Sequence, residues 1–240
     1  MFSFIGYQSI KMVRAYLRGV QGVSAFVANF SEKKPKLPSS HDLLKARIMA
    51  NFLDDNSSIL DVGCGNGRRL MDLSLFLKNL DCTGIEINKN KYLPSYPEDI
   101  KNNITLKSFD GINIPFEDKN FDYVSICYVL HHLSTDHAQK IINEMIRVGK
   151  NKILILEDSR PKFSKAYKLR NWLHATEANL EYATKSESFV KNFRHNMFKD
   201  YNEWKSFLMS FPEIVNVEIK SLNSISKYKH HTLIVCKLKR

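Results

Sequence analysis

Ile59-Leu60-Asp61-Val62-Gly63-Cys64-Gly65-Asn66-Gly67 is the stretch of sequence that decides the fold. It starts as a short apolar run typical of a buried strand and continues into three glycines at alternate positions. Glycine has no Cβ, so the backbone can approach a ligand closely, and the first N–H groups of a following helix can bind a carboxylate. The stretch therefore predicts a strand that turns into a helix around a bound ligand.

Strands and helices are expected to alternate through the rest of the middle of the chain. Predicted strands lie at 58–62, 82–87, 104–109, 121–127 and 153–157, and predicted helices at 41–53, 66–80 and 135–148. Two closing strands are expected at about 214–220 and 230–238, after a capping-box sequence at Asp200–Glu203 that predicts a helix over 204–211. This order favours a parallel sheet with helices on both faces.

The spacing of the glycines separates two kinds of nucleotide site. A dinucleotide-binding loop needs a glycine at position 68, where Arg68 stands. The spacing Asp61-x-Gly63-x-Gly65-x-Gly67 instead resembles motif I of the class I S-adenosylmethionine (SAM)-dependent methyltransferases. The resemblance covers about residues 40–160. It implies an α/β, Rossmann-like, seven-stranded and mostly parallel sheet with an antiparallel last strand, N-terminal helices and a helical cap insertion after the fifth strand.

The same resemblance implies where SAM, the predicted cofactor, would bind. Glu86 ends the second strand, where an acid can accept hydrogen bonds from both ribose hydroxyls. Asp110 follows the third strand, where an acid takes the adenine amino group in the resembling family. The predicted cofactor-binding residues are Asp61, Gly63, Cys64, Gly65, Gly67, Glu86, Ile87, Asp110, Gly111 and Cys127. No metal site is predicted, because no His, Cys, Asp or Glu cluster has metal-ligand spacing.

A general base is needed only if the acceptor is protonated at the working pH. Candidates at the carboxyl ends of the fourth and fifth strands are Tyr128, His131, His132, Glu157 and Asp158. The predicted catalytic residues are His132, Tyr128 and Glu157, with His132 first because an imidazole titrates near neutral pH. The alternative is that His132 caps or packs the helix that follows. The other histidines considered, interpreted as surface or packing residues, are His174, His195, His230 and His231.

The chain is expected to divide into a helical or lid segment at 1–38 and a methyltransferase domain at 39–240, with the cap at about 160–211. Residues 2–30 place Lys11, Arg14 and Arg18 on one helical face. A lid helix, a membrane-surface helix and a targeting peptide all remain open for this segment. Scattered cysteines and the lack of an 18-residue apolar run predict a cytoplasmic protein, with peripheral membrane contact as an alternative.

The acceptor is the least determined part of the prediction. The stretch from Ile114-Pro115-Phe116 to His131-His132 is similar to two groups: the tRNA wobble-uridine carboxymethyl methyltransferases and the type 11, ubiquinone-biosynthesis-like methyltransferases of small molecules and lipids. Phe198–Trp204 resembles the second group. Residues 159–240 hold 16 Lys and Arg against 7 Asp and Glu, so an anionic acceptor or RNA could bind there.

The sequence therefore predicts methyl transfer to an oxygen or nitrogen atom of a small-molecule or lipid-like acceptor. A tRNA acceptor, bound through the basic C-terminal third, is the first alternative. A non-catalytic partner subunit that shares the fold is the second.

Overall fold

A computed structural model describes residues 40–87, 103–159, 199–222 and 231–239 of the 240-residue chain. The predictions for residues 2–30, and those for 160–198 in the cap, lie outside these described residues. So do His174, His195 and His230. The description below concerns the unit from Pro38 to Arg240.

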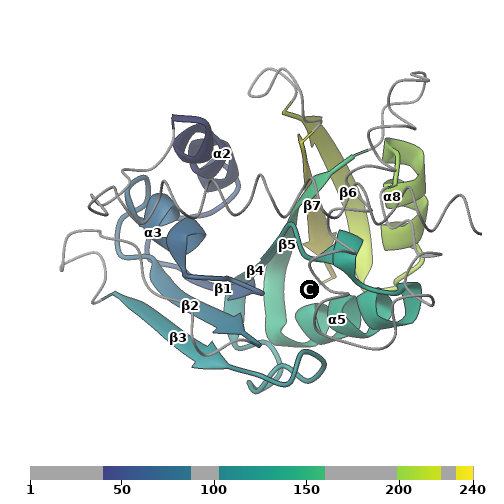
Figure 1. The fold of residues 1–240 in the computed structure, drawn as a ribbon, viewed down its shortest axis with the longest axis horizontal. Helices are drawn as coiled ribbons and strands as arrows, with labels where there is room; N and C mark the ends of the chain where they lie inside the picture. Colours follow the sequence, from purple (N-terminus) through teal and green to yellow (C-terminus); the bar gives the residue numbers. More distant parts are fainter. Residues whose placement is uncertain (1–39, 88–102, 160–198, 223–230, 240) are drawn as a thin grey trace, which may run out of the picture. The chain divides into compact units, whose positions relative to one another are not determined.

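A seven-stranded sheet forms the centre of this unit (Figure 1), with the strand order β3-β2-β1-β4-β5-β7-β6. The strands are β1 (Ser58–Val62), β2 (Asp81–Glu86), β3 (Ile104–Ser108), β4 (Phe121–Cys127), β5 (Gly149–Asp158), β6 (Ile214–Ser221) and β7 (His231–Leu238). β7 pairs antiparallel with both β5 and β6, and the pairs among β1 to β5 are parallel. The predicted mostly parallel sheet with an antiparallel last strand is confirmed.

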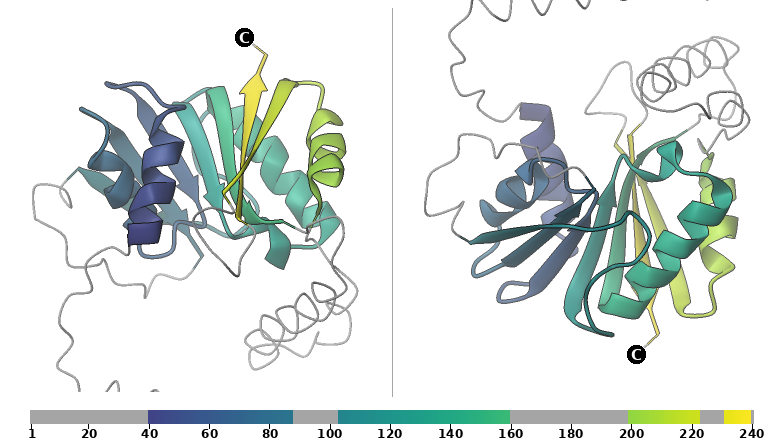
Figure 2. Two further views of the ribbon diagram at one scale, coloured as in Figure 1. Left: turned by 90° about the horizontal axis from the view of Figure 1, so that it is seen from above. Right: turned by 60° about the horizontal axis from the view of Figure 1, so that its bottom comes forward.

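Helices cover both faces of the sheet (Figure 2). α5 (Thr135–Val148) and α8 (Tyr201–Met209) pack on one face against β-strand residues such as Val124 and Ile155. α2 (Ser40–Ala50) and α3 (Arg68–Ser74) pack on the other face, where Ile59 and Leu154 contribute to a second core cluster. Because successive strand residues point to opposite faces, the central strands β1, β4 and β5 contribute side chains to both clusters.

The termini of the helices follow from local side chains. Ser134 accepts a hydrogen bond from the His137 N–H at the start of α5. At α8, the side chain of Asp200 accepts from the Asn202 and Glu203 N–H groups while Glu203 accepts from the Asp200 N–H. The capping box predicted from the sequence is therefore confirmed, and it starts the helix at Tyr201, earlier than expected.

Two further predicted boundaries are wrong for identifiable reasons. The helix expected over 66–80 ends at Ser74, because the chain must turn into β2; Asn79 adopts a left-handed backbone (φ 51°) and its side chain bonds Asn56. β5 begins at Gly149, directly after α5, not at Ile153. A side chain at position 149 would place its Cβ 2.9 Å from the Met145 carbonyl oxygen, so glycine permits this abrupt change.

Candidate cofactor and acceptor site

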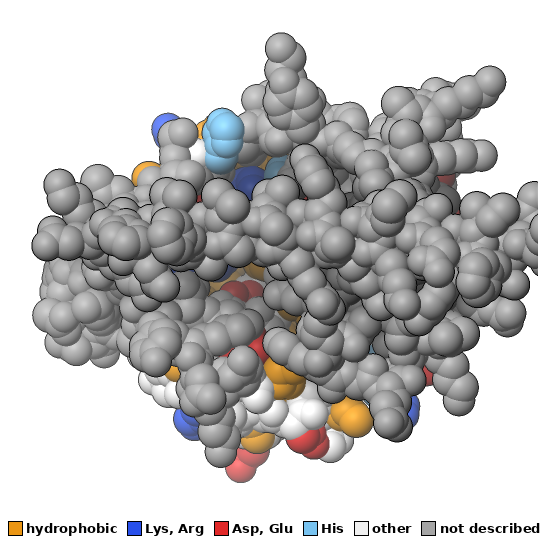
Figure 3. Space-filling view, in the orientation of Figure 1, with side chains coloured by type: hydrophobic (Ala, Val, Ile, Leu, Met, Phe, Trp, Pro, Cys, Tyr) orange, Lys and Arg blue, Asp and Glu red, His pale blue; other side chains and the backbone are white. Residues whose placement is uncertain are grey.

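The predicted site residues come together at one edge of the sheet. β1, β2, β3, β4 and β5 are parallel, so their carboxyl ends meet there, and the antiparallel β7 brings its first residue to the same edge. The order reverses between β1 and β4, and ligands bind at such a switch point in open α/β sheets. The space-filling view shows acidic, hydrophobic and histidine side chains among the described residues of one face (Figure 3).

The glycine loop is fixed to β2 by its backbone. The N–H groups of Gly63 and Cys64 both donate to the Ile85 carbonyl oxygen, at 2.8 and 3.0 Å. Gly63 has φ 69°, and a Cβ there would lie 2.7 Å from Val129 Cγ2, so packing excludes a side chain. Gly65 has φ 60°, yet nothing lies within 4 Å of the position that its Cβ would occupy. Gly65 therefore faces open space at the place where a ligand would meet the loop.

Glu86 connects the end of β2 to this loop. Its Oε2 atom accepts a hydrogen bond from the Gly65 N–H at 2.8 Å, so the acid predicted to bind a ribose also holds the loop in place. Asp61 lies deeper, since it is buried and accepts a hydrogen bond from the Ser125 hydroxyl of β4 at 2.7 Å. Burial raises the pKa of Asp61 to about 6. Asp61 thus supports the glycine loop from the buried interior. Its partner Ser125 could not be identified from the sequence.

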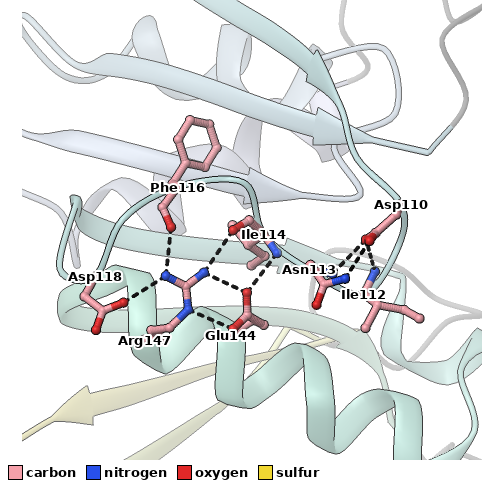
Figure 4. Close-up of polar contacts among 8 residues, drawn as sticks. All are labelled: Asp110, Ile112, Asn113, Ile114, Phe116, Asp118, Glu144 and Arg147. Carbon is pink, nitrogen blue, oxygen red and sulfur yellow. Dashed lines mark hydrogen bonds and ion pairs between the residues drawn. The ribbon is translucent and has the colours of Figure 1, made fainter.

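Asp110 begins a loop whose backbone it also organises (Figure 4). Its Oδ1 atom accepts from the N–H groups of Ile112 and Asn113, and its Oδ2 atom accepts from the Asn113 side chain. These hydrogen bonds lower the pKa of Asp110 below its usual value. Ile87 is 59% exposed, and its Cγ2 lies 3.2 Å from the Cβ position of Gly111. An acid and an exposed apolar side chain therefore border the same loop.

Glu157 holds the turn that contains the predicted histidines. One of its oxygens accepts from the Val129 and Leu130 N–H groups, at 3.0 and 2.7 Å, and the other lies 2.6 Å from His131 Nδ1. Glu157 is fully buried and the His131 side chain is nearly so. His132, the histidine favoured by the sequence, is exposed and stacks on His131 with ring centroids 3.9 Å apart. The structure thus pairs Glu157 with His131.

A second histidine–carboxylate pair lies on the opposite face of the sheet. His231 at the start of β7 has its Nδ1 atom 2.7 Å from Asp158 and 3.1 Å from the Tyr128 hydroxyl. Burial raises the pKa of Tyr128, so this phenol stays protonated at neutral pH. Cys127, also predicted to border the cofactor, ends β4 and packs against the core cluster on the α2 and α3 face. The pairing of His231 with Tyr128 is not legible in the sequence, because 103 residues separate the two.

Comparisons with known proteins identify the class of this domain. Residues 59–152 match the family model described as a methyltransferase domain. Together with the seven-stranded sheet and the glycine loop, the match indicates a methyltransferase domain with the class I SAM-dependent fold over these residues. The residues present fit SAM as the cofactor: an open position at Gly65, a carboxylate at Glu86 and the bordered loop at Asp110.

Individual relatives agree with this class. The chain is 32% identical over 155 residues to the demethylmenaquinone methyltransferase of Staphylococcus haemolyticus, a match that covers 59% of this chain and 64% of the relative. The Staphylococcus saprophyticus enzyme of the same name is 30% identical, over 54% of this chain and 58% of the relative. The chain thus spans about three fifths of the length of these relatives.

A solved structure shows the same fold at low identity. A SAM-dependent methyltransferase from Methanosarcina mazei superposes with a TM-score of 0.55 and 21% identity, covering 80% of this chain and 96% of that one. The likeness supports the fold. Within the described residues, no helix is both long and apolar enough to cross a membrane.

Proposed function

We propose that this protein transfers the methyl group of SAM to an oxygen or nitrogen atom of a small-molecule acceptor, with His131 as the proton acceptor. SAM, when bound, supplies an electrophilic methyl group on a sulfonium. The chain's own contribution is to hold the donor with Glu86 and Asp110, to align the acceptor, and to accept the acceptor's proton. The observation that carries the proposal is the buried His131–Glu157 pair at the edge where the glycine loop ends.

The hydrogen bond to Glu157 decides which nitrogen of His131 would act. A carboxylate accepts only, so the 2.6 Å contact places the proton on Nδ1 and leaves the lone pair of the neutral ring on Nε2. Glu157 also fixes the ring's orientation, because its other oxygen is bonded to the backbone of the same turn. Nε2 would therefore take the proton, and Glu157 would stabilise the imidazolium that forms.

The acceptor class is supported by the relatives' names and by the lining of the site. The two Staphylococcus relatives described above are named demethylmenaquinone methyltransferases, which favours a ring-type, quinone-like or phenolic small molecule here. A phenolic hydroxyl is protonated at neutral pH and needs a base, which the histidine–carboxylate pair provides. The basic residues from 159 onward make an anionic or lipid-like acceptor compatible with this proposal.

The test is transfer of a labelled methyl group from SAM to separate pools of quinols and phenols, lipids, and tRNA. His131→Asn should lower turnover by about 10²–10⁴-fold while SAM affinity changes little. His132→Asn is the matched control, since it removes the exposed neighbouring ring, and it should cost much less. Equal losses in both variants would refute His131 as the base, and transfer confined to tRNA would refute the small-molecule acceptor.

A further inference from the structure

Two side chains of α5, Arg147 and Glu144, tie down the loop that begins at Asp110 (Figure 4). Arg147 donates from Nε and Nη2 to the two oxygens of Glu144, at 2.8 and 2.7 Å. It also donates to the carbonyl oxygens of Ile114 and Phe116, at 2.9 and 2.8 Å, and to Asp118. One guanidinium thus joins the last turns of α5 to three residues of the loop.

Three consecutive backbone N–H groups of this loop donate hydrogen bonds to carboxylates. Those of Ile112 and Asn113 donate to Asp110, and that of Ile114 donates to Glu144 at 2.9 Å. Both backbone groups of Ile114 are therefore bonded to the Arg147–Glu144 pair, and its side chain is buried. The backbone from Asp110 to Phe116 is therefore held at its start by the Asp110 side chain and at its end by Arg147 and Glu144 of α5.

This pair differs from an ordinary surface ion pair. An exposed pair gains little, because water competes for both charges. Here the pair is partly buried and bidentate, and the hydrogen bond from Arg147 lowers the pKa of Glu144. The planar fork of Arg bonds a carboxylate and two carbonyl oxygens at once, a geometry that Lys cannot reproduce. Loss of Arg147 would leave the Ile114 and Phe116 carbonyl oxygens without these donors.

We propose that Arg147 and Glu144 are positioning residues that set the adenine selectivity of the cofactor site. They would act through the loop, because the direction of the Asp110 carboxylate depends on where residues 112–114 are held. The proposal rests on the loop receiving adenine, as proposed for Asp110 above. It adds a determinant on α5, at the far end of a helix from the histidine turn, which contacts neither the donor nor the acceptor.

The experiment compares the binding of two ligands by calorimetry: S-adenosylhomocysteine, and its inosine analogue, in which a keto oxygen replaces the adenine amino group. Arg147→Met should weaken the adenine ligand by about tenfold or more, the inosine ligand less, so the selectivity ratio falls. Glu144→Gln keeps the shape of the side chain and serves if Arg147→Met does not fold. Lys150→Met is the matched control, because among the described residues it breaks the partly exposed Lys150–Asp122 pair and leaves the Arg147–Glu144 pair intact.

Hydrogen exchange of the apo protein supplies a second readout. The amides of residues 112–114 should lose protection in Arg147→Met and keep it in Lys150→Met. An unchanged selectivity ratio, including equal weakening of both ligands, would overturn the proposal by showing that the pair only stabilises the fold. If the wild-type chain bound neither ligand, the cofactor site itself would be refuted, a result distinct from failure of the positioning role.

Discussion

Replacement of Glu86 by alanine tests the cofactor site most directly. In the structure, Glu86 Oε2 accepts from the Gly65 N–H at 2.8 Å, which uses one of the roughly four acceptor positions of a carboxylate. The two ribose hydroxyls of SAM are expected to donate to the same carboxylate. Glu86→Ala therefore removes two expected ligand contacts together with the contact to Gly65.

The magnitude follows from the charge on the acceptor. A hydrogen bond to a charged group contributes about 1.5–3 kcal/mol, so loss of even one such bond weakens binding by about tenfold or more. The lost Gly65 bond should cost apo stability only about 1 kcal/mol, since the group is partly buried and water can replace the acceptor. Glu86→Gln retains one carbonyl oxygen, so its loss of affinity should be smaller than that of the alanine variant.

Calorimetric titration with SAM measures the affinity, and thermal unfolding of the apo protein measures the stability. We expect a large loss of SAM affinity in Glu86→Ala, a smaller loss in Glu86→Gln, and a small change in Tm. A Glu86→Ala variant that binds SAM within about twofold of wild type would refute the proposed ribose contact, because loss of a charge-assisted hydrogen bond should weaken binding more than that.

Two further predictions concern residues of the glycine loop and the strands beneath it. Gly65→Val should abolish SAM binding with a modest fall in apo Tm, because its Cβ enters open space at positive φ. Gly84→Ala should lower Tm more, since its Cβ would lie 2.6 Å from Cys64 Sγ. A larger fall in Tm for Gly65→Val than for Gly84→Ala would contradict the open space at Gly65. Asp61 has its pKa raised to about 6, so the folded state binds this proton more tightly than the unfolded chain and stability falls as pH rises from about 4 to 6. Asp61→Asn, which can still accept from Ser125, should gain Tm relative to wild type across that range, and a difference independent of pH would count against it.

The order of elements could be predicted from the sequence because its signals are local. Apolar runs at 58–62 and 121–127 gave both strand boundaries as observed, and Asp200 and Glu203 gave the capping box. Boundaries that depend on distant partners were missed. Between the end of α3 and the start of β2, the Asn79 side chain donates to Asn56, 23 residues away, a contact that no local pattern encodes.

The residues of the candidate site likewise fall into those that local sequence predicts and those that depend on distant partners. The glycine spacing, Glu86 and Asp110 were legible because each lies at or near the end of a strand, and parallel strands bring their carboxyl ends to one edge. Whether His131 or His132 meets Glu157 depends on the rotation of one short turn, since neighbouring side chains point in different directions. Adjacent histidines in a sequence carry no information on that choice.

The sequence by itself thus determined the class of the domain, its cofactor loop and the edge where ligands meet it, because these follow from glycine chemistry and strand order. Only the tertiary structure decided which side chains act together: Asp61 with Ser125, His131 with Glu157, and Arg147 with Glu144 and the loop at Ile114. The physical reason is that the Asp61, His131 and Ile114 contacts join residues 26 or more positions apart, and their geometry arises when the sheet and α5 pack.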